Sequence, residues 1–371
     1  MSTDIKTIVV DIGSSSMRAE ESPKYIFPLI IGRPKTLTKT GSQQEDIYIS
    51  SEALKNKEMN NIQYPIQHGI VSSTWSDVEK IFNYTFNNKL HIDPTEYTIL
   101  TTEAIKNPKT HREKLAELLF ETFNFKSLFI GVQGILSLYS SGHFTGICLE
   151  IGDGATQVAP IYKGYLIPQA EYRINFGSCN ITAFLQKILK ERGYDFLSED
   201  QTETIRDIKE KHTYIATDYD NELQKINKSS KDDISYSIAN GNTIKIHDEG
   251  LRCQELLFKP FLNDLDIDGV DKILFDLIKK CDRTLRKHMY ENIILAGDAT
   301  LTKGFTKRLE KEIKILAPKK ANINICLLRD PRCSAWRGGS MYSSYDRFSQ
   351  MVLQGDLYKE VGNSILHCIF Y

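Results

Sequence analysis

The sequence predicts an α/β protein that is built from two related halves. The chain has 371 residues, which is too long for one typical core and suits two or more domains. Strand-like apolar runs alternate with helix-like amphipathic runs, as they do in α/β domains. A short stretch also recurs, because IVVDIGSSSMR at 8–18 resembles ICLEIGDGATQ at 147–157.

Both copies of this repeat predict a β-hairpin. Each has an apolar strand, an acid, Ile-Gly and small polar residues, and each is followed by another strand-like run, YIFPLII at 25–31 and QVAPIYKGYLI at 157–167. Two hairpins that are built alike imply two halves of related topology.

Between the two copies, helix and strand patterns alternate. The segment 76–90 predicts a helix, because its apolar residues recur at helical spacing after Ser76, which suits an N-cap. The segment 111–124 predicts a second, amphipathic helix. The remaining predictions here are strands at 97–104 and 127–132 and a short helix at 133–142 that ends at glycine.

The second half repeats this alternation. Helices are predicted near 180–192, 199–216 and 270–288, and strands near 293–296 and 323–327. Asn240 and Gly241 stand between alternating apolar residues, which predicts a hairpin turn. Residues 33–61 are polar and turn-rich, and we expect them to form a mobile surface element.

Composition limits the classes of function. Lys plus Arg is 47 and Asp plus Glu is 48, so no global field attracts nucleic acid or an acidic membrane. No run approaches the ~18 apolar residues of a membrane span, and we expect no secretory leader. The 7 cysteines are odd in number and none has C-x-x-C spacing, which predicts neither a disulfide framework nor a zinc site but reduced thiols inside the cell.

The hairpin tips suggest anion binding. Gly152 and Gly154 permit positive φ and close backbone approach, so their N–H groups can point at an anion. Ser14, Ser15 and Ser16 offer hydroxyl donors at the first tip. Two such tips that face each other would hold a polyphosphate from both sides. The alternative is a pair of structural β-turns, in which Gly and Asp are common.

Charged residues beside the tips extend this hypothesis. Asp11, Glu150 and Asp153 are too acidic to touch phosphate directly, but they suit the outer shell of a hydrated Mg²⁺ that bridges phosphate oxygens. Arg18 would make a charge-assisted contact with phosphate.

Long segments of the chain resemble actin, over essentially its full length. The segments that carry the resemblance are YPIQHGIVSSTWSDVEKIFNYTF (64–86), LTTEAIKNPKTHREKLAELLFETFN (100–124), LSLYSSG (136–142), ERGYDF (191–196), RDIKEKHTYIATD (206–218), LRCQELLFKP (251–260) and WRGGSMYSS (336–344). The collinear match, rather than any short motif, makes the resemblance specific. It implies an actin-like ATPase fold, with two related domains around a nucleotide cleft.

The resemblance also implies a division of the chain. Residues 1–140 form the first actin-like half, with 33–61 as the mobile clasping-loop region. Residues 141–335 form the second half, with 178–260 as its outer subdomain, and 336–371 return to the first half.

Site residues follow from the resemblance one by one. ATP or ADP with Mg²⁺ is the implied cofactor, and the metal is held through water by Asp11, Glu150 and Asp153. The residues around the attacking water are Gln133, Gln157, Asp11 and Asp153. The implied cofactor-binding residues are Gly13, Ser14, Ser15 and Arg18 at the first tip, Gly152, Asp153, Gly154 and Ala155 at the second, and Arg206, Lys209, Glu210, Gly297, Asp298 and Arg332 near the nucleoside.

Departures from actin change the expected activity. Gln157 stands where actin has a histidine, and an amide relays protons poorly near neutral pH. Ser15, Ser178 and Asp298 each replace a glycine, and a carboxylate at 298 would repel phosphate. We therefore expect nucleotide binding with slow or absent hydrolysis, and the question whether the chain is an actin-type ATPase stays open.

Assembly surfaces depart as well. The 33–61 region lacks the apolar tip of actin's clasping loop, and the segment 261–269 is strongly acidic where actin has an apolar plug. Burying Asp264, Asp266 and Asp268 would cost several kcal/mol unless each is paired.

These features favour a divergent actin-related protein, which acts as a structural or regulatory subunit of a cytoskeletal complex in the cytoplasm. The expected partners are proteins, with actin or other actin-related subunits as candidates, and neither direct nucleic-acid contact nor a membrane span is expected. Two alternatives stay open: a divergent conventional actin that polymerises and hydrolyses ATP, and a nuclear actin-related subunit of a chromatin-remodelling complex.

Overall fold

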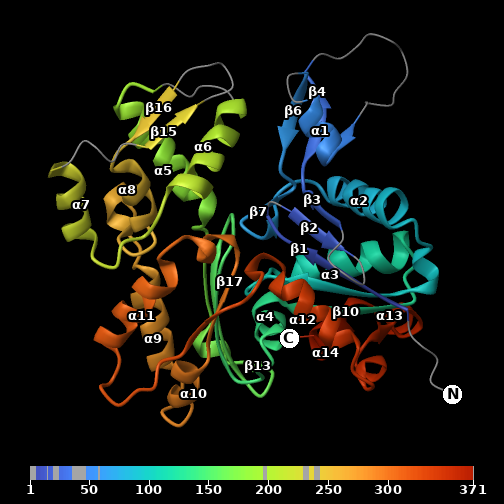
Figure 1. Cartoon of the computed structure of the whole chain (residues 1–371). Helices are drawn as coiled ribbons and strands as arrows, with labels where there is room; N and C mark the ends of the chain where they lie inside the picture. Colours follow the sequence, from blue (N-terminus) through green and yellow to red (C-terminus); the bar gives the residue numbers. More distant parts are fainter. Residues whose placement is uncertain are drawn as a thin grey trace. The chain divides into compact units, whose positions relative to one another are not determined.

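The computed structural model describes residues 6–14, 16–19, 25–35, 47–56, 59–194, 199–228, 234–237 and 243–370 (Figure 1). The chain forms two compact units. Unit 1 comprises Met1–Phe144, Lys163–Tyr165 and Arg332–Tyr371, and unit 2 comprises Thr145–Tyr162 and Leu166–Pro331.

A six-stranded mixed sheet lies at the centre of unit 1. Its strand order is β19-β10-β9-β1-β2-β3. The strands are β1 (Thr7–Ile12), β2 (Ser16–Ala19), β3 (Tyr25–Pro28), β9 (Thr98–Glu103), β10 (Ser127–Val132) and β19 (Leu353–Gln354). β1, β9 and β10 run parallel, whereas β1 and β2 form an antiparallel hairpin. β9 is buried at every position, as expected for a central strand that has helices on both faces.

The other elements of unit 1 include a separate three-stranded sheet of order β5-β4-β6. The strands are β4 (Ile31–Pro34), β5 (Tyr48–Ile49), β6 (Asn60–Gln63), β7 (Ile66–Gln67) and β8 (Ile70–Val71), and the helices are α1 (Ser51–Lys55), α2 (Trp75–Asn83), α3 (Lys109–Glu117), α4 (Gln133–Ser140), α12 (Ser334–Ser343), α13 (Gly355–Val361) and α14 (Leu366–Ile369). α2 continues as a π-helical segment to Leu90, and α3 continues in the same way to Thr122.

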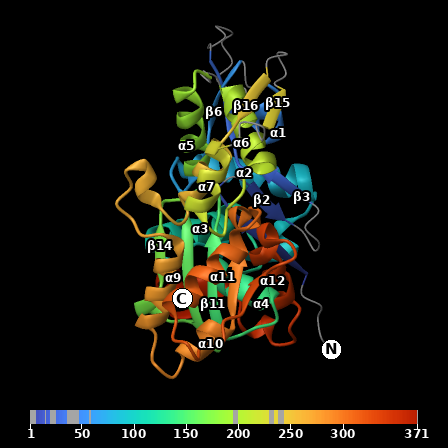
Figure 2. The same ribbon diagram turned by 60° about the vertical axis from the view of Figure 1, so that its left-hand side comes forward.

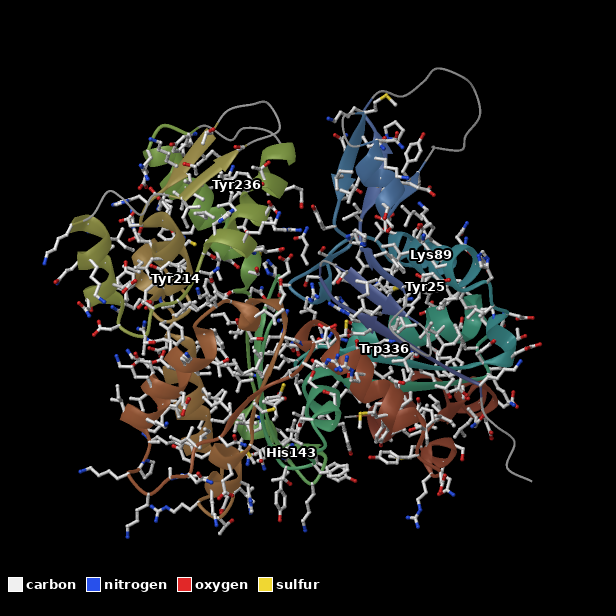
Figure 3. All side chains as sticks on the ribbon, viewed as in Figure 1. Tyr25, Lys89, His143, Tyr214, Tyr236 and Trp336 are labelled. Carbon is white, nitrogen blue, oxygen red and sulfur yellow. The ribbon has the colours of Figure 1, made fainter. Side chains whose placement is uncertain are left out.

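The C-terminal segment is integral to unit 1, because α12 packs against α4, β1 and β9. A Cβ at Gly338 would lie 1.7 Å from the carbonyl oxygen of Leu136, so only glycine allows this close helix crossing. Trp336, labelled in Figure 3, donates its indole N–H to the carbonyl of Val9 at 3.1 Å. The segment therefore closes the core over β1.

Unit 2 repeats the central sheet in a modified form. Its strand order is β13-β12-β11-β17-β18, and β14 also pairs with β12. The strands are β11 (Gly146–Ile151), β12 (Thr156–Tyr162), β13 (Tyr165–Leu166), β14 (Tyr172–Ile174), β17 (Ile293–Ala296) and β18 (Ile325–Leu327). β11, β17 and β18 run parallel, and β11 and β12 form an antiparallel hairpin.

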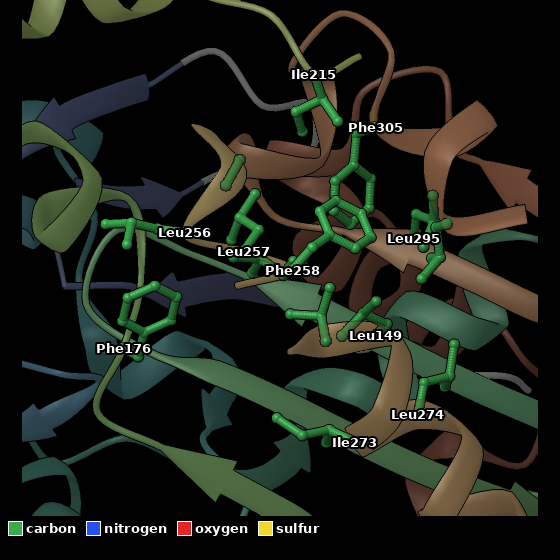
Figure 4. Packing of buried hydrophobic residues seen from close by; sticks show 14 of the residues in the cluster. Leu149, Phe176, Ile215, Leu256, Leu257, Phe258, Ile273, Leu274, Leu295 and Phe305 are labelled. Carbon is green, nitrogen blue, oxygen red and sulfur yellow. The ribbon is translucent and has the colours of Figure 1, made fainter. Parts of the chain in front are cut away.

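The helices of unit 2 lie partly on this sheet and partly on one another. They are α5 (Ser178–Glu191), α6 (Glu199–His212), α7 (Tyr219–Lys228), α8 (Glu249–Glu255), α9 (Val270–Lys280), α10 (Arg286–Glu291) and α11 (Phe305–Leu316), and a separate hairpin joins β15 (Ile234–Ser237) to β16 (Thr243–Ile246). α9 contacts both β12 and α11, and Figure 2 shows α9 and α11 beside β11. The core of unit 2 brings together residues such as Leu149 of β11, Leu274 of α9 and Phe305 of α11 (Figure 4).

The two predicted hairpins are built alike, as the sequence repeat implied. In unit 1, Asp11 lies opposite Arg18 across the strands, and Gly13 donates its N–H to Ser16. In unit 2, Glu150 lies opposite Gln157, at the equivalent positions of the repeat. Both halves therefore use the same strand register and place an acid just before the tip.

Some sequence predictions were wrong in detail. The single helix predicted at 270–288 is two helices, α9 and α10, because the backbone becomes extended at Cys281. The strand predicted at 157–167 is interrupted where Lys163 and Gly164 adopt positive φ. Within the region 33–61, for which no regular element was predicted, the described residues include β5, β6 and the helix α1. The predicted Asn240-Gly241 turn lies outside the described residues, although β15 and β16 on either side of it do pair.

Two further observations concern the cysteines and the helices. All 7 cysteines are free. Within the described ranges, no helix is both long and apolar enough to cross a membrane.

Candidate functional site

The first half of the candidate site is the hairpin tip between β1 and β2. Gly13 donates its N–H to the carbonyl of Ser16 at 3.0 Å, which closes the tip. The hydroxyl oxygen of Ser14 accepts the backbone N–H of Gly69 at 2.6 Å. The tip is thereby tied to the turn between β7 and β8, and because Ser14 is the acceptor in this contact, its O–H can still act as a donor. Ser15 lies outside the described residues.

Asp11 is the buried centre of the first half-site. Its Oδ2 accepts Arg18 Nη1 at 3.1 Å, and its Oδ1 accepts the Thr102 hydroxyl at 2.7 Å and Gln133 Nε2 at 3.2 Å. The prediction for Arg18 named only phosphate as its partner, whereas its guanidinium pairs with Asp11. Thr102 was missed, because only the parallel pairing of β1 with β9 brings it beside Asp11.

Gln133 begins α4 and is buried against the same carboxylate. Its amide nitrogen also donates to the carbonyl of Ile12 at 3.1 Å. These two contacts fix the orientation of the amide group. The side-chain carbonyl oxygen of Gln133 is then the atom that could accept a hydrogen bond from a bound water.

The second half of the candidate site is the tip between β11 and β12. Gly152 donates its N–H to the carbonyl of Ala155 at 3.0 Å, the same closure as in the first tip. The first N–H groups of α5 bind this tip, because Ser178 donates to the Gly152 carbonyl at 3.0 Å and Cys179 donates to the Asp153 carbonyl at 2.9 Å. The helix N-terminus thus holds the tip in place.

The tip glycines do not use the positive φ that glycine permits. Gly152 and Gly154 are not among the glycines with positive φ. The close approach instead occurs at Gly177, where a Cβ would lie 2.5 Å from the Asp153 carbonyl oxygen. Gly297 does have positive φ, at 84°, and a Cβ there would lie 2.3 Å from the Ile151 carbonyl oxygen. The structure therefore gives Gly297 a packing role beside the second tip.

Charged side chains of unit 2 gather near this tip. Lys209 of α6 is buried and donates to the carbonyl of Ser178 at 3.2 Å and to the Ser178 hydroxyl. Burial lowers the pKa of Lys209, and the negative charges of Asp298 and Asp153 oppose that shift. Burial raises the pKa of Asp298, and the nearby Asp153 raises it further. Arg206 Nη2 lies 4.0 Å from Asp153 Oδ1, at the limit of an ion pair.

The other predicted residues lie at different depths. Gln157 is buried in β12, opposite Glu150. Glu210 is exposed on α6, next to Lys209 in sequence. Arg332 is exposed at the point where the chain enters unit 1. Within the part of the chain that the structure describes, no group of three or more His, Cys, Asp or Glu side chains could by itself hold a metal ion. Of the predicted metal residues, Asp11 belongs to unit 1, and Glu150 and Asp153 belong to unit 2.

The fold and the two half-sites define an α/β protein with an internally repeated hairpin, each copy closed by the same hydrogen bond. Comparison with protein families adds a specific finding, because the family model for actin matches residues 2–371. The match covers essentially the whole chain, and the chain belongs to the actin family. The predicted resemblance and the predicted fold class are confirmed.

Proposed function

We propose that this chain is a divergent actin-related protein, which binds ATP or ADP with Mg²⁺ through both half-sites. The observation that supports this most is the repeated tip. Both tips have the same closing hydrogen bond and an acid at the equivalent position, Asp11 in one and Glu150 in the other. A duplicated tip would supply two sets of backbone N–H donors for polyphosphate oxygens, and actin-family membership agrees with that use.

The residues present fit a magnesium nucleotide. Backbone N–H groups at the two tips would bind phosphate oxygens. Asp11, Glu150 and Asp153 provide hard oxygen donors, which Mg²⁺ prefers, and water would bridge them to the ion. Bound Mg²⁺ would neutralise phosphate charge, and this chain's residues would orient the phosphates and exclude bulk water.

Hydrolysis is proposed to be slow or absent. Gln133 can orient a water, but its amide nitrogen is bound by Asp11 and by the Ile12 carbonyl. Gln157 is a neutral amide at every accessible pH, so it cannot accept a proton from an attacking water. The site could thus position an attacking water but has no strong base to take its proton, which is consistent with a nucleotide that serves as a structural ligand.

The acidic plug segment, 261–269, supports a role set by partners. Leu262, Leu265 and Ile267 pack against the core of unit 2, so the intervening aspartates are turned outward and exposed. Phe261 is 65% exposed beside them. This surface suits a basic partner better than a copy of itself, because like charges would meet in a self-contact. We propose a partner protein in a cytoskeletal complex and a location in the cytoplasm, with the nucleus as the alternative.

Calorimetry on nucleotide-stripped protein tests the binding proposal. Mg²⁺-ATP or Mg²⁺-ADP should bind, and Asp153→Ala should weaken binding by ~1.5–3 kcal/mol, which is typical of a lost charged contact. Asp93→Ala, which removes an exposed carboxylate far from either tip in sequence, is the matched control and should bind normally. Absence of heat with both nucleotides, together with unchanged thermal stability, would contradict the proposal.

A further inference from the structure

Unit 2 has a pocket whose lining residues are all different from the hairpin-tip residues described above. It has a volume of about 660 Å³ and lies between the end of α9, helix α10 and the segment that follows α11. This volume is within the range of ~300–1,000 Å³ that is typical of small-molecule sites. Its lining residues are Phe275, Lys279, Arg283, Arg286, Lys287, Tyr290, Glu291, Leu316, Ala317, Pro318, Lys320, Ala321 and Asn322.

The lining combines an apolar wall with a cationic rim. Phe275, Tyr290 and Leu316 are among its large apolar side chains, and Tyr290 is buried. The rim has five cations, whereas Glu291 is the single acid of the lining. The whole chain is nearly neutral, with a net charge of -1, so this local excess of positive charge is not a consequence of composition.

Three of the rim cations have roles within the protein. Arg286 donates to the backbone carbonyls of Cys281 at 3.0 Å and Lys279 at 2.5 Å, which caps the end of α9. Lys287 lies 3.8 Å from Glu291, and Lys279 lies 5.3 Å above the ring of Phe275. These contacts give Arg286, Lys287 and Lys279 roles in the protein that need no ligand.

Arg283 and Lys320 are different. Both are exposed, and among the described residues neither forms an ion pair. They add two positive charges to a rim that is already cationic, which raises mutual repulsion. An anionic group in the pocket would relieve that repulsion, and an attached apolar body would bury against the Phe275, Tyr290 and Leu316 wall.

We propose that this pocket binds a small amphipathic anion, in which an acidic group contacts Arg283 and Lys320 and an apolar or aromatic body fills the interior. Charge complementarity selects the acidic group, and the apolar wall selects the body. The pocket would give this chain a ligand-responsive site that is separate from the hairpin tips.

The fluorescent probe 8-anilinonaphthalene-1-sulfonate tests the proposal, because it joins an aromatic body to a sulfonate. Titrations use the full-length protein with saturating Mg²⁺-ATP, so that the hairpin tips are not open to the probe. We expect one saturable site on the wild type. The double variant Arg283→Glu with Lys320→Glu should bind about tenfold more weakly, because two charge-assisted contacts are lost and two repulsive ones are added.

Two controls separate this site from general binding. Lys319→Glu reverses one charge beside Lys320 but outside the lining, half of the charge change in the double variant, and it should leave affinity unchanged. N-phenyl-1-naphthylamine, the same aromatic body without the sulfonate, should bind the wild type about tenfold more weakly. Circular dichroism checks that the variants fold. A loss smaller than about threefold in the double variant, or equal affinity for the two probes, would overturn the proposal.

Discussion

Replacing Asp11 with asparagine should destabilise unit 1 far more than an ordinary conservative substitution. The carboxylate accepts three hydrogen bonds, from Arg18, Thr102 and Gln133, and it donates none. Asparagine has the same shape, but one of its two terminal atoms becomes a donor. Whichever way the amide turns, its NH₂ faces a donor group, either the Arg18 guanidinium or the pair formed by Thr102 and Gln133.

The magnitude follows from these contacts. A hydrogen bond to a charged partner contributes ~1.5–3 kcal/mol, and a buried group that loses its partner costs a further ~1–3 kcal/mol. Asp11 is 3% exposed, so water can compensate for little of this loss. We therefore expect Asp11→Asn to lower the free energy of unfolding of unit 1 by about 3 kcal/mol.

Urea unfolding, followed by tryptophan fluorescence, measures this change, since both tryptophans, Trp75 and Trp336, belong to unit 1. Asp93→Asn is the control, because Asp93 is an exposed cap and asparagine caps equally well. Adding Arg18→Met to Asp11→Asn should recover part of the loss, because the guanidinium that lost its partner is then gone. A loss below about 1 kcal/mol in Asp11→Asn would refute the three-acceptor geometry.

Four further predictions concern other parts of the chain. Asp298→Asn should tighten Mg²⁺-ATP binding by ~1 kcal/mol in calorimetry. Because the pKa of Asp298 is raised above its ordinary 3.8, the wild type should lose folding stability relative to this variant as pH rises through the raised pKa. Equal dependence of stability on pH in the two proteins would contradict the raised pKa. Arg308→Met should cost about 3 kcal/mol in urea unfolding, because the fully buried Glu255 would lose the hydrogen bonds of 3.0 and 3.1 Å and keep only Lys259, at 3.7 Å, as a cationic partner; full stability in this variant would argue against the pair. Gly297→Ala should lower the melting temperature more than Gly142→Ala, since both glycines have positive φ but a Cβ meets the Ile151 carbonyl only at Gly297. Equal decreases in melting temperature would mean that the backbone at Ile151 shifts to make room for the Cβ. Sedimentation with Mg²⁺ and ATP should find the pure protein monomeric, because its plug segment is acidic and exposed; long filaments in negative-stain images would favour a conventional polymerising actin.

The strand register of both hairpins was accessible from sequence, because each copy places an acid and Ile-Gly directly after an apolar strand. That pattern fixes which residues lie at the tip, and the pairing across β1 and β2 then follows from the turn length. The ion pair between Asp11 and Arg18 could have been predicted from this register, since the two residues lie opposite each other. The phosphate contact predicted for Arg18 stays a prediction, and its guanidinium also pairs with Asp11.

Other features depend on contacts that sequence patterns do not report. Thr102 reaches Asp11 through parallel pairing between strands that are far apart in the chain. The break between α9 and α10 has neither glycine nor proline as a signal, and helical periodicity continues through it. There, Arg286 binds the carbonyls of Lys279 and Cys281, which satisfies the end of α9 by a side chain from the following helix.

The two tips share a register but differ in charge, and this difference indicates where a cation would be most favoured. In the first tip, Asp11 lies opposite Arg18 and is paired with it, so the acid is neutralised within the protein. In the second tip, the position opposite Glu150 is Gln157, which carries no charge. Asp153 adds a further acid at that tip, and Arg206 lies 4.0 Å from it, at the limit of an ion pair. Burial disfavours the charged forms of both Asp298 and Lys209 beside it. A divalent cation would relieve more repulsion at the second tip than at the first. We therefore expect Mg²⁺ affinity, measured on folded protein with a fixed ATP concentration, to fall more in Asp153→Asn than in Asp11→Asn, and the reverse order would place the metal's main electrostatic support in unit 1.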